Sequence, residues 1–355
     1  MSRTRFSRLK QQVLLLVACL TCTLTCAPVA NLRTNSRTEI PSRFTGRAPP
    51  PIDHIVLLTT DGVRWQDVFG ARGAEELPTL SRLIQGEGAV IGAPTSRSAI
   101  RASGPAYLSL PGYRELLLGH APSDCQANDC KAPSEPGLVE QLAGADPGDV
   151  AVFASWPTVG DALRPDAPAL VSAGKKYLLG APELARVGLV DTWEAAQAVS
   201  PKPGYNNYRP DHETAALGLA YLQRRHPRFL FMSLGDTDEY AHQGKREAYW
   251  QALRRYDRTV AAVERTLAEF EARGARTLFL LTTDHGRADG FSEHGAAYPE
   301  SSRVWLIAGG SAVRARGTVE SPRERRLRDF APTVLLAAGR SPSASNDGEP
   351  LLELF

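Results

Sequence analysis

The feature that most constrains the fold is a series of apolar segments of strand length that alternate with longer segments of helical pattern. The first, residues 52–60, is mostly apolar and rich in β-branched residues, as expected of a strand buried on both faces. Similar segments recur at residues 149–155, 228–234, 277–283 and 303–308. Helical patterns occupy residues 106–118, 211–225, 246–273 and 325–338. This alternation predicts an α/β fold in which a mainly parallel central sheet lies between helices.

The composition is that of a globular protein with a large core and no strong charge preference. Of the 355 residues, 43% are hydrophobic and 23% are charged. The formal net charge is +2, but four of the basic residues lie in an acid-free leader: Arg3, Arg5, Arg8 and Lys10. Removing these four from the 41 basic residues leaves 37 against 39 acidic residues. The charge therefore gives no reason to expect a nucleic-acid partner.

The N-terminus has the order of an export signal. A basic stretch up to residue 12 precedes an apolar run at residues 13–20, which is too short to span a bilayer as a stable helix. Residues 1–30 are therefore interpreted as a signal that directs the protein to the periplasm, the cell envelope or the medium. Residues 16–19 resemble a bacterial lipobox, which would leave Cys19 lipidated as a membrane anchor. Cleavage near Ala30 would instead release a soluble protein, and both outcomes stay open.

Behind the leader, the sequence predicts a tether and one folded domain. Residues 31–51 are polar, aperiodic and proline-ended, which is typical of a flexible linker, and residues 52–355 are expected to form a single domain. Cys125 and Cys130 are the cysteines of this domain, close enough to close a small disulfide loop in an oxidising compartment. Two free thiols are the alternative, and their spacing makes a poor zinc motif.

Carboxylates follow three of the predicted strands directly. They are Asp61 after residues 52–60, Asp236 and Asp238 after residues 228–234, and Asp284 after residues 277–283. In a parallel sheet these positions share one edge, where the ligand sites of α/β proteins lie. His285 stands beside Asp284, and His242 and His294 follow within ten residues of a carboxylate. One such carboxylate is usually a helix N-cap and a lone histidine a satisfied polar residue, but their coincidence indicates a metal site.

These positions resemble those of the alkaline phosphatase superfamily, which includes nucleotide pyrophosphatase/phosphodiesterases, sulfatases and cofactor-independent phosphoglycerate mutases. The resemblance extends from residues 55–62 to residues 329–339. It is weakest at about residues 123–210, which are expected to form a variable lid. The resemblance implies an alkaline-phosphatase-like fold and two divalent metal ions.

The ligands of both ions have matches in this chain. The resemblance assigns Asp61, Asp284 and His285 to one ion, which the nucleophile also touches. It assigns Asp238, His242 and His294 to the other. Asp236 is an alternative to Asp238, but only Asp238 lies four residues before His242, as the family pattern requires. The mixed imidazole and carboxylate ligands favour zinc, with manganese as the second choice.

The resemblance also implies a nucleophile. Residues 107–113 are similar to the superfamily segment in which a serine or threonine lies two residues before a proline at the start of a helix, and Ser109 and Pro111 match it. The N-terminus of a helix favours an anion such as a phosphoryl oxygen. Ser103 and Ser98 are weaker alternatives, and a simple helix N-cap is the alternative role for Ser109.

Together these residues predict an exported metal-dependent hydrolase of phosphoric esters. Two cations about 4 Å apart would neutralise the ester and lower the pKa of Ser109, whose alkoxide would attack phosphorus and form a phosphoseryl intermediate. The expected substrate is a small-molecule phosphate monoester or diester. The alternative is a catalytically silent protein that binds a phosphorylated or sulfated ligand in the same cleft.

Departures from the family limit how far the substrate can be named. In nucleotide pyrophosphatase/phosphodiesterases the residue after the proline contacts the phosphate, and here it is Gly112, followed by Tyr113. The sulfatase pattern requires an arginine where Tyr113 stands, so a sulfatase is disfavoured. A phosphomutase is disfavoured as well, because residues 123–210 are too short for its inserted domain. The candidates for substrate contacts are Gly112, Tyr113, Arg97 and Arg101, although each arginine is better explained as a solvated surface charge.

Overall fold

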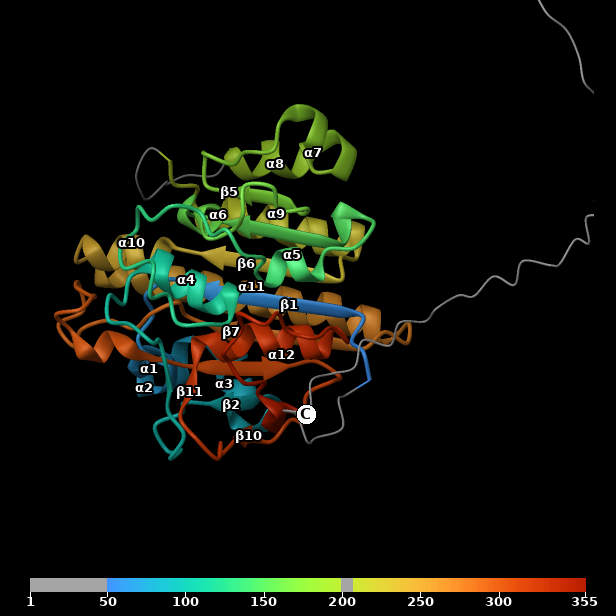
Figure 1. Ribbon diagram of the computed structural model, residues 1–355. Helices are drawn as coiled ribbons and strands as arrows, with labels where there is room; N and C mark the ends of the chain where they lie inside the picture. Colours follow the sequence, from blue (N-terminus) through green and yellow to red (C-terminus); the bar gives the residue numbers. More distant parts are fainter. Residues whose placement is uncertain (1–49, 199–206) are drawn as a thin grey trace, which may run out of the picture. The chain divides into compact units, whose positions relative to one another are not determined.

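The apolar segments assemble into a central sheet of eight strands (Figure 1). The computed structural model describes residues 50–198 and 207–355, so the leader with Cys19 and almost all of the tether lie outside the described residues. In spatial order the strands are β10 (Gly317–Thr318), β2 (Ala89–Ile91), β9 (Leu306–Gly309), β7 (Thr277–Thr282), β1 (His54–Thr60), β6 (Phe229–Leu234), β4 (Val150–Ala154) and β5 (Leu170–Ala173). Only β9 of these eight runs antiparallel to its neighbours. The predicted α/β fold with a mainly parallel sheet is confirmed.

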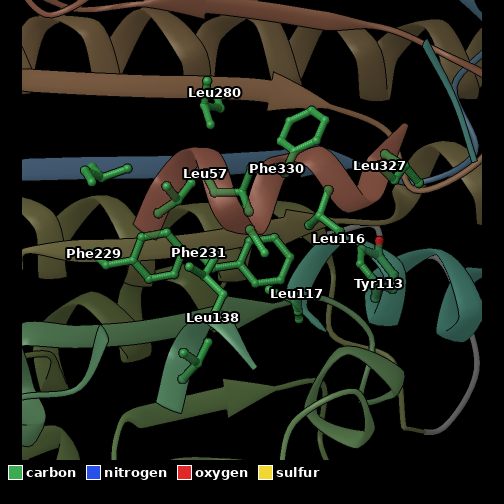
Figure 2. Close-up of a cluster of buried hydrophobic side chains, with 14 of the residues drawn as sticks. Leu57, Tyr113, Leu116, Leu117, Leu138, Phe229, Phe231, Leu280, Leu327 and Phe330 are labelled. Carbon is green, nitrogen blue, oxygen red and sulfur yellow. The ribbon is translucent and has the colours of Figure 1, made fainter. Parts of the chain in front are cut away.

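Helices cover both faces of this sheet, because successive side chains of a buried strand point to opposite sides. On β1, Leu57 belongs to one apolar core and Val56 to the other. The first core includes residues of α4 (Ser109–Leu118), α5 (Leu138–Leu142), α6 (Thr158–Asp161) and α12 (Phe330–Ala337). The second includes residues of α3 (Pro78–Arg82), α9 (Asp211–Arg225) and α11 (Arg246–Glu271). Figure 2 shows the first core, in which Phe231 of the sheet and Phe330 of α12 are buried together.

Two of the predicted segments are divided by the fold. Residues 303–308 form β8 (Arg303–Val304) and the start of β9, because β8 leaves the main sheet and pairs with β3 (Ile100–Arg101). Residues 325–338 are helical only from Phe330 onwards, since β11 (Arg325–Arg326) completes a second sheet in the order β11-β3-β8. Strands of two residues carry no periodicity that a sequence pattern can detect.

Much of the region expected to form a lid belongs to the central layer. β4 and β5 extend the sheet beyond β6, and α7 (Ala181–Val187) and α8 (Val190–Gln197) follow them. Near the start of this region Cys125 and Cys130 are joined by a disulfide, with their Cα atoms 5.6 Å apart. On the other side of the sheet, β1 is followed by the short helices α1 (Trp65–Phe69) and α2 (Ala71–Glu76). No helix within the described ranges has the length and apolar character that crossing a membrane requires.

Candidate metal centre

The parallel register of three central strands brings distant residues to one edge of the sheet. β1 pairs in parallel with β6 on one side and with β7 on the other. Asp61 directly follows β1, and Asp284 comes two residues after β7. The short helix α10 (Asp236–His242) begins two residues after β6 and carries Asp238 and His242 one turn apart. The candidate ligands therefore lie beyond the carboxyl ends of the strands, as predicted.

Asp61, Asp284 and His285 form a buried cluster, which we call the inner cluster. Their ligand atoms all lie within 4.8 Å of one another, and Nε2 of His285 is 3.5 Å from Oδ1 of Asp61 and 3.5 Å from Oδ2 of Asp284. Nδ1 of His285 donates to the carbonyl oxygen of Gly286 at 2.8 Å, which leaves the lone pair on Nε2. Oδ2 of Asp284 is buried and has no hydrogen-bond partner within residues 50–198 and 207–355. An orphaned carboxylate oxygen beside an imidazole lone pair fits a divalent cation.

Asp238, His242 and His294 form an adjoining outer cluster. Nε2 of His242 lies 3.2 Å from Oδ2 of Asp238 and 3.0 Å from Nε2 of His294. Nδ1 of His294 donates to the carbonyl oxygen of Tyr107 at 2.9 Å, so its Nε2 faces the cluster. The His294 ring stacks on that of His285 with centroids 4.0 Å apart, which places the two clusters side by side. The outer cluster is the more open one, since the His242 side chain is 39% exposed.

Ser109 lies against the inner cluster. It is the first residue of α4, and its Oγ is 3.4 Å from Oδ1 of Asp61 and 3.3 Å from Nε2 of His285. The N-cap residue of α4 is Leu108, which makes no side-chain cap hydrogen bond. Ser109 is therefore not a helix cap, and its hydroxyl points at two of the candidate ligands.

The residues that competed for these roles have other partners. Oγ of Ser103 donates to Glu115 at 2.7 Å, and Oγ of Ser98 donates to Glu320 at 3.2 Å. Both carboxylate oxygens of Asp236 accept hydrogen bonds, one of them from Arg255 at 2.9 Å. Neither alternative serine, nor Asp236, presents a free atom to the clusters.

The four candidates for substrate contacts have different positions. A Cβ at Gly112 would lie 2.4 Å from the carbonyl oxygen of Asp284, so glycine permits the close approach of α4 to β7. Tyr113 is buried, and its hydroxyl donates to Oδ2 of Asp61 at 3.0 Å while accepting from Ser233 at 2.9 Å. These two residues therefore shape and orient the inner cluster, and their contact with substrate stays a prediction.

The two arginines among these candidates point to other groups. The Arg101 guanidinium donates to Glu324 at 3.0 Å and to Ser302 at 2.9 Å. Arg97 is exposed, and its backbone N–H donates to Glu320. The structure brings neither side chain to the two clusters, which favours the interpretation of both as surface charges.

Burial and mutual repulsion disfavour negative charge in the inner cluster. Burial, with the charges of neighbouring carboxylates, raises the pKa of Asp61 well above its usual range, and burial raises the pKa of Asp284 to about 7. Burial also lowers the pKa of His285 to about 4 and that of His294 to about 3, so both rings are neutral at pH 7. Neutral imidazoles are competent ligands, and a divalent cation would offset the carboxylate charges.

The sequence interpretation missed Arg287, a guanidinium buried at this edge with 1% exposure. Arg287 bonds to Oδ1 of Asp238, and it also donates to the carbonyl oxygens of Gly62 at 3.1 Å and Ser292 at 2.8 Å. Burial alone would raise the pKa of Asp238, but the charge of Arg287 and a hydrogen bond from His242 hold it well below its usual range. The sequence offered one signal, the proximity of Arg287 to the Asp284-His285 pair.

Glycine at position 62 makes room for this arginine. Its φ of +60° is a conformation that side-chain-bearing residues rarely adopt. A Cβ there would lie 2.6 Å from Nη2 of Arg287 and 2.7 Å from Oδ1 of Asp238. The residue after Asp61 is therefore glycine both for its backbone conformation and for the space it leaves.

Fold and site together describe an α/β protein whose candidate metal ligands lie beyond the carboxyl ends of its strands. Residues 199–341 match the model of the Metalloenzyme superfamily. No curated protein matches the sequence. The matched segment contains five of the candidate ligands and is similar to metalloenzymes, in agreement with the resemblance to the alkaline phosphatase superfamily that the motifs predicted.

Solved structures of the superfamily share the fold at low sequence identity. The alkaline phosphatase PafA is 10% identical with a TM-score of 0.62, covering 87% of this chain and 100% of its own. The phosphonate monoester hydrolase of Agrobacterium radiobacter is 16% identical with a TM-score of 0.57, covering 85% of this chain and 77% of its own. A 2-O GAG sulfatase is 13% identical with a TM-score of 0.58, covering 85% of this chain and 73% of its own.

Proposed function

We propose that this protein is a metal-dependent hydrolase of phosphoric esters that uses Ser109 as its nucleophile. The observation that carries the proposal is the position of the Ser109 hydroxyl, 3.4 Å from Asp61 and 3.3 Å from His285 in a buried cluster with cation-binding chemistry. A hydroxyl is a weak nucleophile at its ordinary pKa, and it becomes a strong one beside bound cations. Its contact with two candidate ligands is the arrangement that this activation requires.

The residues present fit two divalent cations. The inner cluster would hold one, and Asp238, His242 and His294 would hold the other. Zinc suits the mixed carboxylate and imidazole ligands best, with manganese as the second choice. When bound, the cations supply Lewis acidity, which offsets the charge of the ester and lowers the pKa of hydroxyl groups.

The chain itself supplies the nucleophile and its orientation. Oγ of Ser109 bonds to phosphorus while the bond from phosphorus to the alcohol oxygen breaks, and the alcohol leaves with a proton. Water then displaces the serine oxygen from phosphorus, which releases phosphate and restores the hydroxyl. The N-terminal end of α4 favours the anionic phosphoryl group throughout. Tyr113 keeps Asp61 in place by donating to its second oxygen.

A phosphoric rather than a sulfuric ester is the preferred substrate class. The sulfatase pattern requires an arginine four residues after the nucleophile, and Tyr113 stands there with its hydroxyl committed to Asp61 and Ser233. The alkaline phosphatase and the phosphonate monoester hydrolase that share the fold act on phosphorus, as their names state. A small-molecule monoester or diester of phosphate is therefore the proposed substrate.

Release of p-nitrophenol tests the proposal. Zinc-loaded or manganese-loaded protein should hydrolyse p-nitrophenyl phosphate, bis-p-nitrophenyl phosphate or both, and Ser109→Ala should lower kcat by at least about a thousandfold. Ser103→Ala is the matched control, because Ser103 bonds to Glu115 outside the clusters and its loss should leave the rate within a few-fold. Metal-loaded protein that turned over neither ester, with Ser109→Ala unchanged, would support a silent ligand-binding protein instead.

We also propose that the enzyme acts outside the cytoplasm. The signal-like leader supports this location, and the Cys125–Cys130 disulfide is of a kind that persists in oxidising compartments. The mass of the mature N-terminus would distinguish a lipid anchor at Cys19 from cleavage near Ala30. An unprocessed N-terminus would contradict export.

A further inference from the structure

The two clusters differ in net charge. The inner cluster contains the two carboxylates of Asp61 and Asp284, and one oxygen of Asp284 has no hydrogen-bond partner in the described part of the chain. The outer cluster has one carboxylate, Asp238, and that carboxylate already bonds to the buried guanidinium of Arg287. An arginine cannot lose its proton in a protein, so this positive charge is permanent. A dication therefore meets two negative charges at the inner cluster and, with Arg287 counted, none in net at the outer one.

The clusters also compete for one imidazole. His285 lies within 4.8 Å of Asp61 and Asp284, and within the same distance of Asp238 and His294. Its Nδ1 donates to the carbonyl oxygen of Gly286, so only Nε2 is available. One nitrogen lone pair serves one ion. If Nε2 of His285 coordinates the ion of the inner cluster, the ion of the outer cluster needs His242 as a ligand. His242 is the last residue of α10 and is partly exposed.

We propose that Arg287 makes the two metal sites unequal, with a tight site at Asp61, Asp284 and His285 and a weak one at Asp238, His242 and His294. The guanidinium supplies beside Asp238 a fixed positive charge that a second dication would otherwise provide. At low metal concentration the chain then holds one ion, and Arg287 remains the positive group of the outer cluster. This inference rests on the ligand assignment of the proposed function but not on the reaction.

Arg287 also orients Asp238, and this effect on metal affinity is opposite to that of its charge. Groups that hydrogen-bond to metal ligands usually orient them and raise metal affinity, commonly by ~10-fold to 100-fold. Such groups are mostly neutral or anionic. Arg287 instead carries a full positive charge, and only the carboxylate of Asp238 would separate it from the ion. The side chains of Arg287 and Asp238 are 0% and 14% exposed, so solvent only weakly screens the repulsion between this guanidinium and a nearby dication. Repulsion should therefore outweigh orientation, and the net effect of Arg287 on the outer site should be weaker binding.

Metal titration of the stripped full chain tests the inference. Zinc titrated against a chelating indicator should bind to the native protein in two phases, with affinities at least ~10-fold apart. Arg287→Gln should tighten the weak phase by ~10-fold or more and leave the tight phase unchanged. Arg64→Gln is the matched control, since Arg64 is a partly buried arginine that pairs with Asp67 and with no candidate ligand. Its two phases should match those of the native protein.

Three results would overturn the inference. They are equal affinities in the native protein, a weaker second phase in Arg287→Gln, and no binding of zinc or manganese at all. If Arg287→Gln does not fold, Asp238→Asn decides instead, because it should abolish the weak phase and spare the tight one, and loss of the tight phase would be contrary. Ester hydrolysis is measured separately, so unequal sites without turnover would contradict the proposed function alone.

Discussion

Two pairs of buried carboxylates lie at the carboxyl edge of the central strands, and they differ in how their oxygens are satisfied. Asp211 accepts from Ser155 at 2.6 Å and from the backbone N–H groups of Gly235 at 2.7 Å and Asp236 at 3.0 Å. Asp236 in turn accepts from the N–H of Asp211 at 3.1 Å. Each of these two aspartates begins a helix, α9 or α10, and each caps the helix of the other.

In the other pair, both oxygens of Asp61 accept hydrogen bonds, from Ser109 and Tyr113, but Asp284 is left incomplete. Oδ2 of Asp284 has no hydrogen-bond partner among the described residues, and Nε2 of His285 lies 3.5 Å from it. A buried carboxylate that the protein satisfies fully is part of the architecture, whereas one that the protein leaves unsatisfied needs a ligand from outside. The presence or absence of a hydrogen-bond partner for each oxygen therefore distinguishes candidate metal ligands from structural carboxylates, although both kinds follow strands.

The largest effect that would test this distinction is on activity. Asp284→Asn removes a ligand charge, and since metal-ion catalysis contributes several kcal/mol, kcat/KM should fall by at least ~1000-fold. Asp236→Asn is the matched control, and its folded fraction should keep most of the native activity because both Asp236 oxygens are used structurally. Steady-state kinetics with p-nitrophenyl phosphate at saturating zinc measures both. Equal losses of kcat/KM in Asp284→Asn and Asp236→Asn would show that the carboxylates with and without complete hydrogen bonding do not differ in function.

The free energy of unfolding should show the opposite order, with the larger loss at the structural carboxylate Asp211 and the smaller loss at Asp284. Asp211→Ala leaves the amides of Gly235 and Asp236 without an acceptor, so the free energy of unfolding of the metal-free protein should fall by ~2–4 kcal/mol. Asp284→Ala should cost less in the same urea titration, because burial disfavours the charge of Asp284 and only Oδ1 accepts hydrogen bonds, from the N–H of Gly62 at 3.1 Å and from Thr283 at 3.4 Å. A larger loss of unfolding free energy in Asp284→Ala than in Asp211→Ala would contradict the distinction between structural carboxylates and candidate metal ligands.

Glu115 is intermediate between the satisfied and the unsatisfied carboxylates. Its oxygens accept hydrogen bonds, but burial still disfavours its charged form. It accepts from Ser103 at 2.7 Å and from the N–H of Arg328 at 3.3 Å, and burial raises its pKa to about 7. Because the folded pKa exceeds the unfolded one, its contribution to stability is complete below about pH 4.5 and is lost as pH rises through 7.

The Glu115→Gln variant isolates this contribution. Glutamine stays neutral, so the free energy of unfolding of the variant minus that of the native protein should increase by roughly 2–3 kcal/mol between pH 4.5 and pH 8. Paired urea titrations across that range measure the difference and cancel the effects of other titrating groups. A difference that does not change with pH would mean that the hydrogen bonds keep the carboxylate charged and that burial is unimportant.

The sequence predicted the parts of this site that depend on short spacings and on strand ends. Asp238 was distinguished from Asp236 by its four-residue spacing to His242, and the structure leaves Asp238 facing His242 while Asp236 is occupied elsewhere. Arg287 escaped prediction because its burial depends on a partner forty-nine positions away and on the space left by Gly62. Side chains that meet across the fold leave no periodic signal in the sequence. The two-residue strands β3 and β11 were not predicted because segments so short have no periodicity either.

The smallest expected effect concerns Tyr113, which supports a ligand without being one. Its hydroxyl donates to Oδ2 of Asp61 at 3.0 Å, and partners of this kind are commonly worth ~10-fold to 100-fold in metal affinity. Tyr113→Phe should therefore weaken the tighter zinc phase by about tenfold, or ~1.4 kcal/mol, and raise the zinc concentration needed for half-maximal activity. The rate at saturating zinc should change little, because the nucleophile and all ligands remain.

Tyr256→Phe is the control for losing a buried hydroxyl. Tyr256 is equally buried and donates to the carbonyl oxygen of Leu58 at 3.2 Å, away from both clusters. Both variants should lose a similar free energy of unfolding, ~1 kcal/mol, but only Tyr113→Phe should change zinc affinity. If zinc affinity were the same in both, Asp61 would be held by the backbone and by the cation alone. Asp61 would then be a satisfied structural carboxylate like Asp211, and the contrast with unsatisfied carboxylates would depend on Asp284 alone.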